Sequence, residues 1–506
     1  MRKKTMDLGY FQMLLEKYRQ EKAPLQQRLI AAEEYWRLRH THLLEKQQPG
    51  AIRPASGWLV NCILSKHADA VENFPQLACV PRSQAQEESV ALVNRVLPAV
   101  LTRAGFDQVW SDVWWQKLKA GTGVYGVFWD PQGEEVALRR VDLKDLYWQP
   151  GVENLEDSEA VFCLADMDTQ MLMRQYPQLK NFQGSRLWRQ EPSQTPMGDN
   201  LSTVVDVYYK RFGKLHYLKY VGCHILFATE GNSLFPNGLY SHGKYPFVLD
   251  PLFPQEGYPG CGYGYVDLCR DAQNVVDILS SCFVKNALVC ATPRWFVRTD
   301  GAVDEKEYAD FTKPFVHVRG RMDEESIRPI SQEGLPQVYV DLLQMKIDEI
   351  KEVAGNRDVN NGATNRNVTA AAAIAALQEA GNNLSKDMIA GSYRAVARVA
   401  ELVLALLRQF YQQERSFRVL GEDGNGRYFR LSSQMLPQEG QVDISVEAQK
   451  ENRYDRQEFN QLVLELYKLG AFRGENREES LRLVEALDIR GKERLRCFLK
   501  EADHGE

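Results

Sequence analysis

The chain has 506 residues, of which 44% are hydrophobic and 26% charged, and this balance excludes a disordered or fibrous protein. Its formal net charge of -6 argues against broad binding to nucleic acid, which needs a basic surface. The length allows roughly two to four domains.

The cysteines and the longest apolar runs indicate the cellular compartment of the protein. Nine cysteines form no CxxC pair, and an odd number in a long chain favours reduced thiols in a cytosolic setting. The basic start is followed by no apolar run, so we expect no signal peptide. The runs Thr369–Leu377 and Ala400–Leu407 fall far short of the roughly 20 residues that span a bilayer. The sequence therefore predicts a cytosolic chain with no membrane segment.

The first 120 residues are predicted to be mostly helical. Residues 10–47 carry few breakers except Pro24, which predicts two helices that meet near it. Pro75 and Pro81 bracket a segment that we expect to be extended, because proline disfavours helix at the residue before it. Further helices are predicted over residues 58–73, 87–102 and 106–120.

A β-rich region follows, from Gly121 to about Val248. Val124–Trp129 and Glu135–Val141 are rich in β-branched and aromatic residues and flank a Pro- and Gly-containing turn, which is typical of a hairpin. Three shorter strands are predicted at Val204–Phe212, Leu215–Tyr220 and Cys223–Thr229. Dense turn formers over residues 250–264 mark a boundary.

Two helices separated by an insertion come next. Tyr265–Val289 predicts one helix of roughly 37 Å. The insertion, Cys290–Gly334, predicts strands at Arg294–Arg298 and Pro314–Arg319 and a short helix near Glu305–Phe311.

The second helix, predicted over Leu335–Ala354, has a narrow polar face. Its members, at i, i+3, i+4 and i+7 spacing, are Gln337, Asp341, Gln344, Asp348 and Lys351. An Asn-rich loop, Gly355–Asn367, has no apolar core of its own. A long helix then runs from Thr369 to about Gln412.

The last part of the chain predicts strands and then helix. The strands are Phe417–Leu420, Arg427–Leu431 and Val442–Val446, and residues 453–506 are charged and helical. The β-rich segments before residue 250 and after residue 415 are expected to form one continuous β-region.

The catalytic and metal motifs in the sequence are weak. Gly121–Gly126 matches GxGxxG, but it lies after a helix and before a strand, which is the reverse of a dinucleotide site. This order favours a helix C-cap followed by close backbone packing. His40 and His42 are interpreted as solvated helix residues rather than zinc ligands. No catalytic constellation is evident, and we expect neither a metal nor a cofactor.

The order and spacing of several segments resemble tailed-bacteriophage portal proteins over nearly the whole chain. These segments include Ser65–Asp69, Glu72–Pro75, Gly121–Val124, Gln378–Gly381 and Leu406–Tyr411. The resemblance implies an α+β portal fold with a helical stem, a β-rich wing and clip, and a helical C-terminal crown. It also implies a dodecameric ring around a channel at one capsid vertex.

The resemblance further divides the chain into parts. In order they are the wing, 1–263; the first stem helix, 264–289; the clip, 290–334; the second stem helix, 335–354; the tunnel loop, 355–367; the rest of the wing, 368–450; and the crown, 451–506.

The same resemblance implies partners, location and site residues. Double-stranded DNA would pass through the ring during packaging and ejection, and terminase large subunit and head–tail adaptor would dock on the clip. Major capsid and scaffolding proteins are further expected partners, no membrane is, and the protein would occur in the virion and, during assembly, in the host cytoplasm. The expected DNA-channel residues are Gln337, Asp341, Gln344, Asp348, Asn356, Arg357, Asn360, Asn361, Asn365, Arg366 and Asn367. The expected clip residues for partner binding are Arg294, Trp295, Arg298, Lys313 and Arg319.

An acidic channel lining agrees with this role, because each phosphate that a protein neutralises adds a salt-dependent attachment to DNA. Asp341 and Asp348 would guide DNA rather than grip it. Two other functions stay open at this point. One is a cytosolic nucleotide-dependent enzyme that uses Gly121–Gly126, and the other is a monomeric scaffold or adaptor protein.

Overall fold

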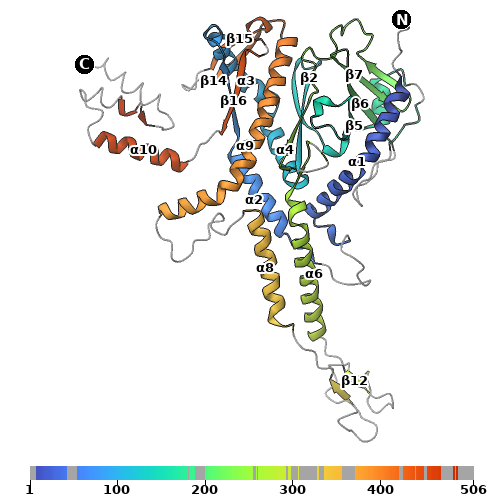
Figure 1. Cartoon of the computed structure of the whole chain (residues 1–506), viewed down its shortest axis with the longest axis vertical. Helices are drawn as coiled ribbons and strands as arrows, with labels where there is room; N and C mark the ends of the chain where they lie inside the picture. Colours follow the sequence, from blue (N-terminus) through green and yellow to red (C-terminus); the bar gives the residue numbers. More distant parts are fainter. Residues whose placement is uncertain are drawn as a thin grey trace. The chain divides into compact units, whose positions relative to one another are not determined.

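A computed structural model gives the structure of the chain (Figure 1). It describes residues 7–42, 54–179, 182–187, 200–254, 258, 260–291, 295–297, 306, 327–329, 335–355, 371–420, 426–438, 440–448, 453–468, 482–484 and 486–487. The chain forms two compact units. The first comprises Met1–Ile30, Ser65–Gly264 and Asn382–Glu506, and the second comprises Ala31–Leu64 and Tyr265–Gly381. Both units are therefore assembled from segments that are distant in the sequence.

Most of the predicted helices are confirmed. Those in the first half of the chain are α2 (Trp58–Glu72), α3 (Glu87–Arg103) and α4 (Phe106–Ala120). Those in the second half are α9 (Ala371–Phe410) and α10 (Arg453–Lys468). A further helix, α5 (Thr169–Gln175), has no predicted counterpart, although the Asp168 side chain caps it by accepting hydrogen bonds from the Gln170 and Met171 amides.

The predicted break at Pro24 is wrong, because α1 (Leu8–Trp36) runs through the proline. One face of this helix is buried on both sides of Pro24, with Tyr18 before it and Leu25 and Leu29 after it. The Lys22 ammonium, also buried, donates to the Leu143 carbonyl over 2.5 Å. Tertiary packing therefore holds the helix continuous at a residue that would break it in isolation.

A five-stranded antiparallel sheet carries helices on both faces. Its strands in spatial order are β4 (Leu146–Trp148), β5 (Ala160–Asp168), β6 (Leu201–Arg211), β7 (Lys214–Val221) and β8 (His224–Ala228). Phe11, Leu15 and Tyr18 of α1 pack on the face that presents Val205 and Val207. The opposite face, which presents residues such as Val204 and Val221, is covered by Leu172 of α5. This alternation along β6 is the period-two pattern of a sheet buried on both sides.

The expected single β-region is wrong, because the first unit holds several separate sheets. The three-stranded sheet consists of β3 (Glu135–Arg140), β2 (Thr122–Asp130) and β9 (Phe247–Pro251), in that order. The two-stranded sheets are β1 (Pro75–Pro81) with β16 (Val442–Ala448), β14 (Arg415–Leu420) with β15 (Gly426–Leu431), and β10 (Phe253–Pro254) with β11 (Gly262–Tyr263). Distant segments do meet, since Pro75 pairs with Ala448, but in a ribbon of their own.

The second unit is built around two long helices that pack together, α6 (Tyr265–Ala291) and α8 (Gln337–Val353). They run side by side in opposite directions (Figure 1). Between them in the chain, β12 (Trp295–Val297) pairs with β13 (Ile327–Pro329). The predicted strand at Arg294–Arg298 is thus confirmed in its central part. The predicted strand at Pro314–Arg319 lies outside the described residues, as does nearly all of the predicted helix near Glu305–Phe311.

A fully buried ion pair joins three segments of the first unit. The Lys117 ammonium of α4 lies 2.6 Å from Asp250 Oδ1 of β9 and 2.6 Å from Ser392 Oγ of α9. Ser392 Oγ in turn donates to Asp250 Oδ2 over 2.6 Å. All three side chains are at most 1% exposed. Burial lowers the pKa of Lys117, while the charge of Asp250 opposes that shift.

A second network of the same composition lies one heptad earlier on α9. The Lys66 ammonium of α2 donates to Ser385 Oγ over 2.8 Å and lies 3.2 Å from Asp69 Oδ2. Ser385 Oγ donates to the same Asp69 oxygen over 2.9 Å. Because residues seven apart share one face of a helix, both networks fix the same side of α9.

All eight described cysteines are free, in agreement with the prediction of reduced thiols. Burial raises the pKa of Cys79 and of Cys261 to about 11. Burial, with the nearby Cys62 and Glu349, raises the pKa of Cys269 to about 12. Cys223, Cys282 and Cys290 are exposed.

We predict that Lys117→Met lowers the free energy of unfolding by about 3–5 kcal/mol, because Asp250 would stay buried without its partner charge. Urea unfolding followed by circular dichroism measures the change. Lys386→Met, at an exposed position of α9, is the matched control and should change stability by less than about 0.5 kcal/mol. A Lys117→Met variant as stable as this control would contradict the prediction.

Candidate functional site

The predicted polar face of α8 is confirmed as one exposed stripe. Gln337, Asp341, Gln344 and Asp348 are all exposed, and Lys351, the fifth predicted member, is half-buried. The Gln337 amide donates to Asp341 over 3.3 Å, and the Gln344 amide donates to Asp348 over 3.0 Å. Each glutamine thus holds the carboxylate one turn further along, and the stripe presents fixed negative charge to solvent.

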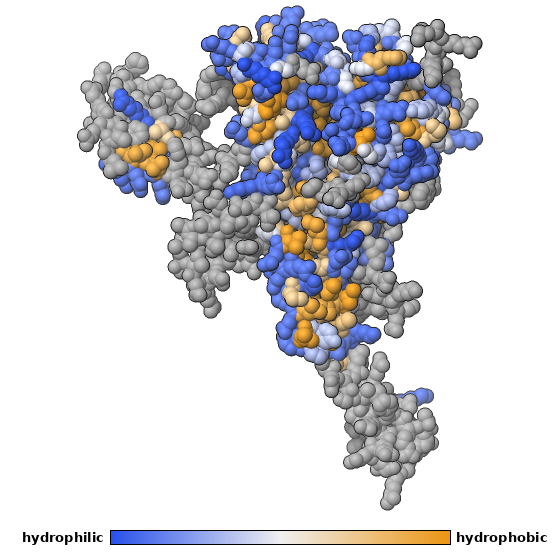
Figure 2. Space-filling view, viewed as in Figure 1, coloured by the Kyte–Doolittle hydropathy of each residue, from blue (hydrophilic) through white to orange (hydrophobic). Residues whose placement is uncertain are grey.

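The polar stripe lies between two apolar stripes of the same helix. One of these, Leu343, Ile347, Ile350 and Ala354, includes the buried residues of α8. The other contains Val338, Leu342 and Met345, of which Val338 is 64% exposed and Met345 57%. Figure 2 shows hydrophobic residues gathered on the surface of these helices. A helix on an ordinary protein surface has a single apolar stripe, whereas α8 has a second one that stays exposed among the residues that the structure describes.

The end of α8 is fixed by Gly355, whose φ of +63° is the left-handed conformation typical of a helix C-terminus. The loop that follows lies outside the described residues, so the structure does not place its expected channel residues, which are Asn356, Arg357, Asn360, Asn361, Asn365, Arg366 and Asn367. The same holds for the clip residues Arg294, Arg298, Lys313 and Arg319. Trp295, the remaining clip residue, lies in β12 opposite Pro329.

A buried polar network on α6 was missed by sequence reasoning. His40, interpreted from the sequence as solvated, is fully buried, and its Nε2 lies 2.8 Å from Asp277 Oδ2. The Ser56 amide and hydroxyl donate to Asp277 Oδ1 over 2.9 and 2.7 Å. Gln273, one turn earlier, donates to Asp277 Oδ2 over 3.0 Å. The available signal was the i, i+4 pair Gln273 and Asp277 on the apolar side of the helix.

These hydrogen bonds decide the charge state of Asp277. Burial by itself would raise the pKa of this carboxyl, but the hydrogen bonds from His40, Gln273 and Ser56 outweigh burial and hold it below its ordinary value. The His40 ring also stacks on Tyr35, with the ring centroids 4.1 Å apart. The interpretation of His42 as an exposed residue is confirmed.

The glycine motif is closed to any ligand. Gly121 ends α4 with a φ of +86°, as the C-cap interpretation predicts, and β2 begins at the next residue. A Cβ at Gly121 would lie 2.1 Å from the Gly262 carbonyl oxygen, and one at Gly123 would lie 2.4 Å from Val113 Cγ1. The glycines therefore serve the approach of protein backbone and leave no room for a pyrophosphate.

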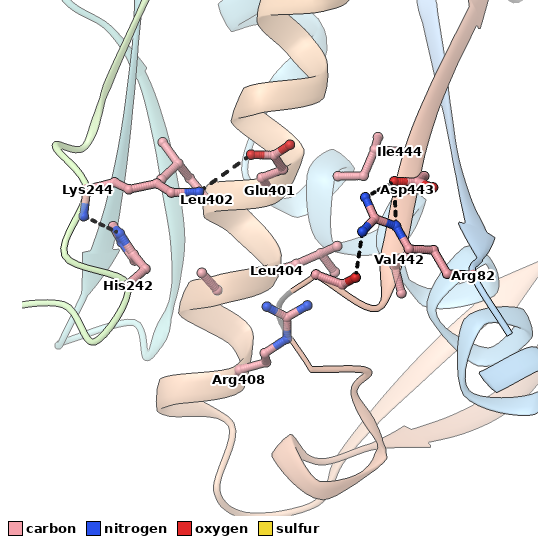
Figure 3. Close-up of a pocket in the computed structure, with 12 residues that line it drawn as sticks. Arg82, His242, Lys244, Glu401, Leu402, Leu404, Arg408, Val442, Asp443 and Ile444 are labelled. Atoms are coloured by element: carbon pink, nitrogen blue, oxygen red, sulfur yellow. Dashed lines mark hydrogen bonds and ion pairs between the residues drawn. The ribbon is translucent and has the colours of Figure 1, made fainter. Parts of the chain in front are cut away.

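A pocket of about 260 Å³ opens beside the C-terminal half of α9 (Figure 3). Arg408 points into it, and its Nε donates to the Pro437 carbonyl over 2.5 Å. At the rim, Arg82 Nε donates to Asp443 Oδ1 over 2.9 Å, and this pairing lowers the pKa of Asp443. The Lys244 ammonium lies 3.7 Å from a Glu401 carboxylate oxygen. The pocket lining includes no serine, cysteine or threonine nucleophile.

Metal sites and membrane-spanning helices are both absent from the part of the chain that the structure describes. None of its groups of histidine, cysteine, aspartate and glutamate side chains could hold a metal ion. None of the helices found there combines the length and the apolarity needed to cross a bilayer.

Comparison with known proteins decides the family. A family model described as "Phage P22-like portal protein" matches residues 68–505 of the chain. The chain belongs to this portal protein family. It is therefore a structural, non-enzymatic component of the virion at the portal vertex, and membership of the family implies an oligomeric ring. The nucleotide-dependent enzyme and the monomeric scaffold are thus both wrong.

Other comparisons add little. A chain from the solved structure "Virion of native gene transfer agent (GTA) particle" aligns with 87% of this portal protein and with 96% of its own length. The two are 11% identical in sequence, and the TM-score is 0.38. A search of curated proteins finds no match. The mixed α+β class of the portal protein is confirmed.

We predict that adding ATP or NAD leaves the melting temperature of the portal protein unchanged within about 1 °C, since ligand binding would raise it. Gly123→Ala should instead lower the free energy of unfolding by about 1–3 kcal/mol, because its Cβ would overpack Val113. Gly57→Ala is the matched control, since nothing lies within 4 Å of the added atom. A nucleotide-induced rise in melting temperature that Gly123→Ala abolishes would contradict the closed motif.

The Asp277 network predicts a dependence of stability on pH. Because the pKa of Asp277 is lowered in the folded state, its contribution is complete above the unfolded-state pKa of about 3.9 and is lost as the pH falls through the folded-state value. Asp277→Asn should cost about 1–3 kcal/mol at pH 7 and reduce the steepness of acid destabilisation below about pH 4. Urea unfolding at a series of pH values measures both effects. Wild-type and variant curves that run parallel in acid would refute the assignment.

Proposed function

We propose that this portal protein forms the channel through which double-stranded DNA is packaged and ejected, with α8 lining the channel. The arrangement of stripes on α8 carries the proposal. A helix that lines a channel in a ring needs a polar face toward the water in the channel and apolar faces toward the helices on both sides. The polar stripe Gln337–Asp348, flanked by one buried and one exposed apolar stripe, has this arrangement.

The charge of the polar stripe suits passage rather than binding. Asp341 and Asp348 give the stripe two carboxylates, Gln337 and Gln344 add neutral amides, and the half-buried Lys351, whose ammonium lies 5.7 Å from the centroid of the Trp58 ring, adds one positive charge. Carboxylates repel the phosphates of DNA, so a stripe with net negative charge neutralises few of them and adds little salt-dependent attachment. A duplex can then slide along the channel without a strong preferred position.

The further assignments follow from the portal resemblance and remain proposals. In this scheme α6 and α8 form the stem of a dodecameric ring, and residues 355–367 form a tunnel loop that faces DNA through Arg357, Arg366 and the neighbouring asparagines. The clip, residues 290–334, docks terminase large subunit during packaging and the head–tail adaptor afterwards. Residues 1–263 and 368–450 form the wing, and residues 451–506 form the crown.

Purified protein should assemble into closed rings of about 600–700 kDa, twelve copies of a 57.9 kDa chain. Replacing residues 356–367 by a Gly-Ser loop of equal length should leave the rings intact but reduce DNA packaging or retention, because the DNA-facing side chains are gone. Electron microscopy with mass photometry measures assembly, and DNase protection of packaged genomes measures retention. Persistent monomer would refute the ring, and unchanged packaging would remove the loop from the channel.

A further inference from the structure

The outer edge of β1 is closed by the protein itself. The Cys79 N–H donates to Asn94 Oδ1 over 2.7 Å, and Asn94 Nδ2 donates to the Cys79 carbonyl over 2.9 Å. Pro75 and Pro81, at the two ends of the strand, have no N–H to offer. An open strand edge is a template on which another chain can pair, and these residues remove that possibility at β1.

The outer edge of β16, the other strand of this ribbon, is left open. Cys79 lies directly opposite Ile444, and the backbone groups of Cys79 point away from β16, toward Asn94. In an antiparallel ladder both members of such a pair point these groups outward, and the pattern repeats at every second residue. The N–H and C=O groups of Val442, Ile444 and Val446 therefore line the outer edge. Within the part of the chain that the structure describes, these groups have no hydrogen-bond partner.

The pocket beside α9 opens along this edge. Residues 442–444 all line it, and since successive side chains of a strand point to opposite faces, a cavity that touches three in a row meets the strand at its edge. The opposite wall is α9, which presents the buried Leu404 and Ala405 and, about one turn later, Arg408 (Figure 3). The open backbone groups thus border a space of about 260 Å³ with an apolar wall and a guanidinium.

We propose that this groove binds an extended segment of another protein, which adds as a strand to the edge of β16 and places a carboxylate on Arg408. Hydrogen bonds to the open backbone groups hold the segment, and its side chains on alternate residues select the sequence. The groove lies within the first unit, so the proposal depends neither on the ring nor on the channel of the proposed function.

Charge complementarity favours an acidic segment. The basic side chains of the lining are Arg82, His242, Lys244 and Arg408. Its two carboxylates already have basic partners, since Asp443 pairs with Arg82 and Glu401 with Lys244. Arg408 adds a further positive charge, so the lining is net positive. A carboxylate on the segment is attracted to this wall, and a lysine is repelled.

The spacing along α9 defines the sequence that fits. Leu404 and Arg408 are four residues apart, which is about 6 Å along a helix. Alternate residues on one side of a strand are about 6.7 Å apart. An apolar residue that packs on Leu404 is therefore two positions from the Asp or Glu that binds Arg408.

Two synthetic peptides test the site on the full-length protein. The first, acetyl-Thr-Val-Thr-Glu-Thr-amide, has the predicted spacing, and in the second a lysine replaces the glutamate. Hydrogen–deuterium exchange at the amides of Ile444 and Val446 should be fast in the free protein and slow with the first peptide. The amides of Ser445 and Glu447 face β1 and serve as the internal control. The lysine peptide should bind at least about tenfold more weakly, because it loses a charge-assisted hydrogen bond.

A pair of substitutions on α9 tests the role of the guanidinium. Arg408→Met should remove the preference for the glutamate peptide. Arg398→Met, at an exposed position of the same helix outside the pocket lining, should keep it. Arg408 also donates to the Pro437 carbonyl, so the melting temperature of each variant is measured alongside. The two peptides on the wild-type chain test the site even where Arg408→Met fails to fold.

Three results would overturn the proposal. The first is that neither peptide slows exchange at Ile444 and Val446 at the highest soluble concentration. The second is that both peptides slow it equally, which would remove the acidic partner. The third is that these amides are already slow in assembled rings and fast in the monomer, which would assign the edge to a second copy of the chain. Slow exchange with the glutamate peptide alone would support the groove as a site for an acidic strand.

Discussion

A lysine without exposed surface holds the first unit together. Lys117 can remain charged in the core only because Asp250 and Ser392 surround its ammonium group, so α4, β9 and α9 must meet at one point. Gly121 and Gly123 lie close to this ion pair. A side chain at either position would collide with Gly262 or Val113, which pack against them. A second lysine, Lys66, repeats the arrangement one heptad away. Rotating α9 would withdraw the hydroxyls of Ser392 and Ser385 from both lysine–aspartate pairs at once, which fixes the face that this helix presents.

In the second unit, the main constraint on α8 is which of its sides face water. Around the circumference of α8 a polar stripe lies between two apolar stripes, and among the described residues one of the apolar stripes is buried and the other exposed. Isolated, such a helix pair exposes apolar area at a cost in free energy. Association removes that area from water while leaving the amides and carboxylates of the polar stripe solvated. One helix can thus serve assembly and the channel together, because the two roles use different sides.

The local patterns in the sequence predicted the individual helices and strands better than they predicted how those helices and strands pack together. Periodicity alone predicted α6, α8 and the hairpin of β2 and β3, because each of these is decided by neighbouring residues. It failed at Pro24, where packing on the five-stranded sheet overrides a local breaker, and at His40, whose partner Asp277 lies 237 residues away. The polar stripe of α8 was predictable for the same reason as the helix. The second apolar stripe was not predicted, because its exposure among the described residues depends on what packs around the helix rather than on its own sequence.

The burial of thiols has a consequence for a particle that leaves the cell. A host cytoplasm is reducing, whereas a released virion meets air and oxidants. Oxidation proceeds through the thiolate, and a thiol with a pKa of about 11 is ionised in only about one molecule in ten thousand at pH 7. Cys79 and Cys261 are therefore chemically quiet long after release. Cys223, Cys282 and Cys290 are exposed in the single chain and lack that burial, so oxidation of the particle would begin at these surface thiols.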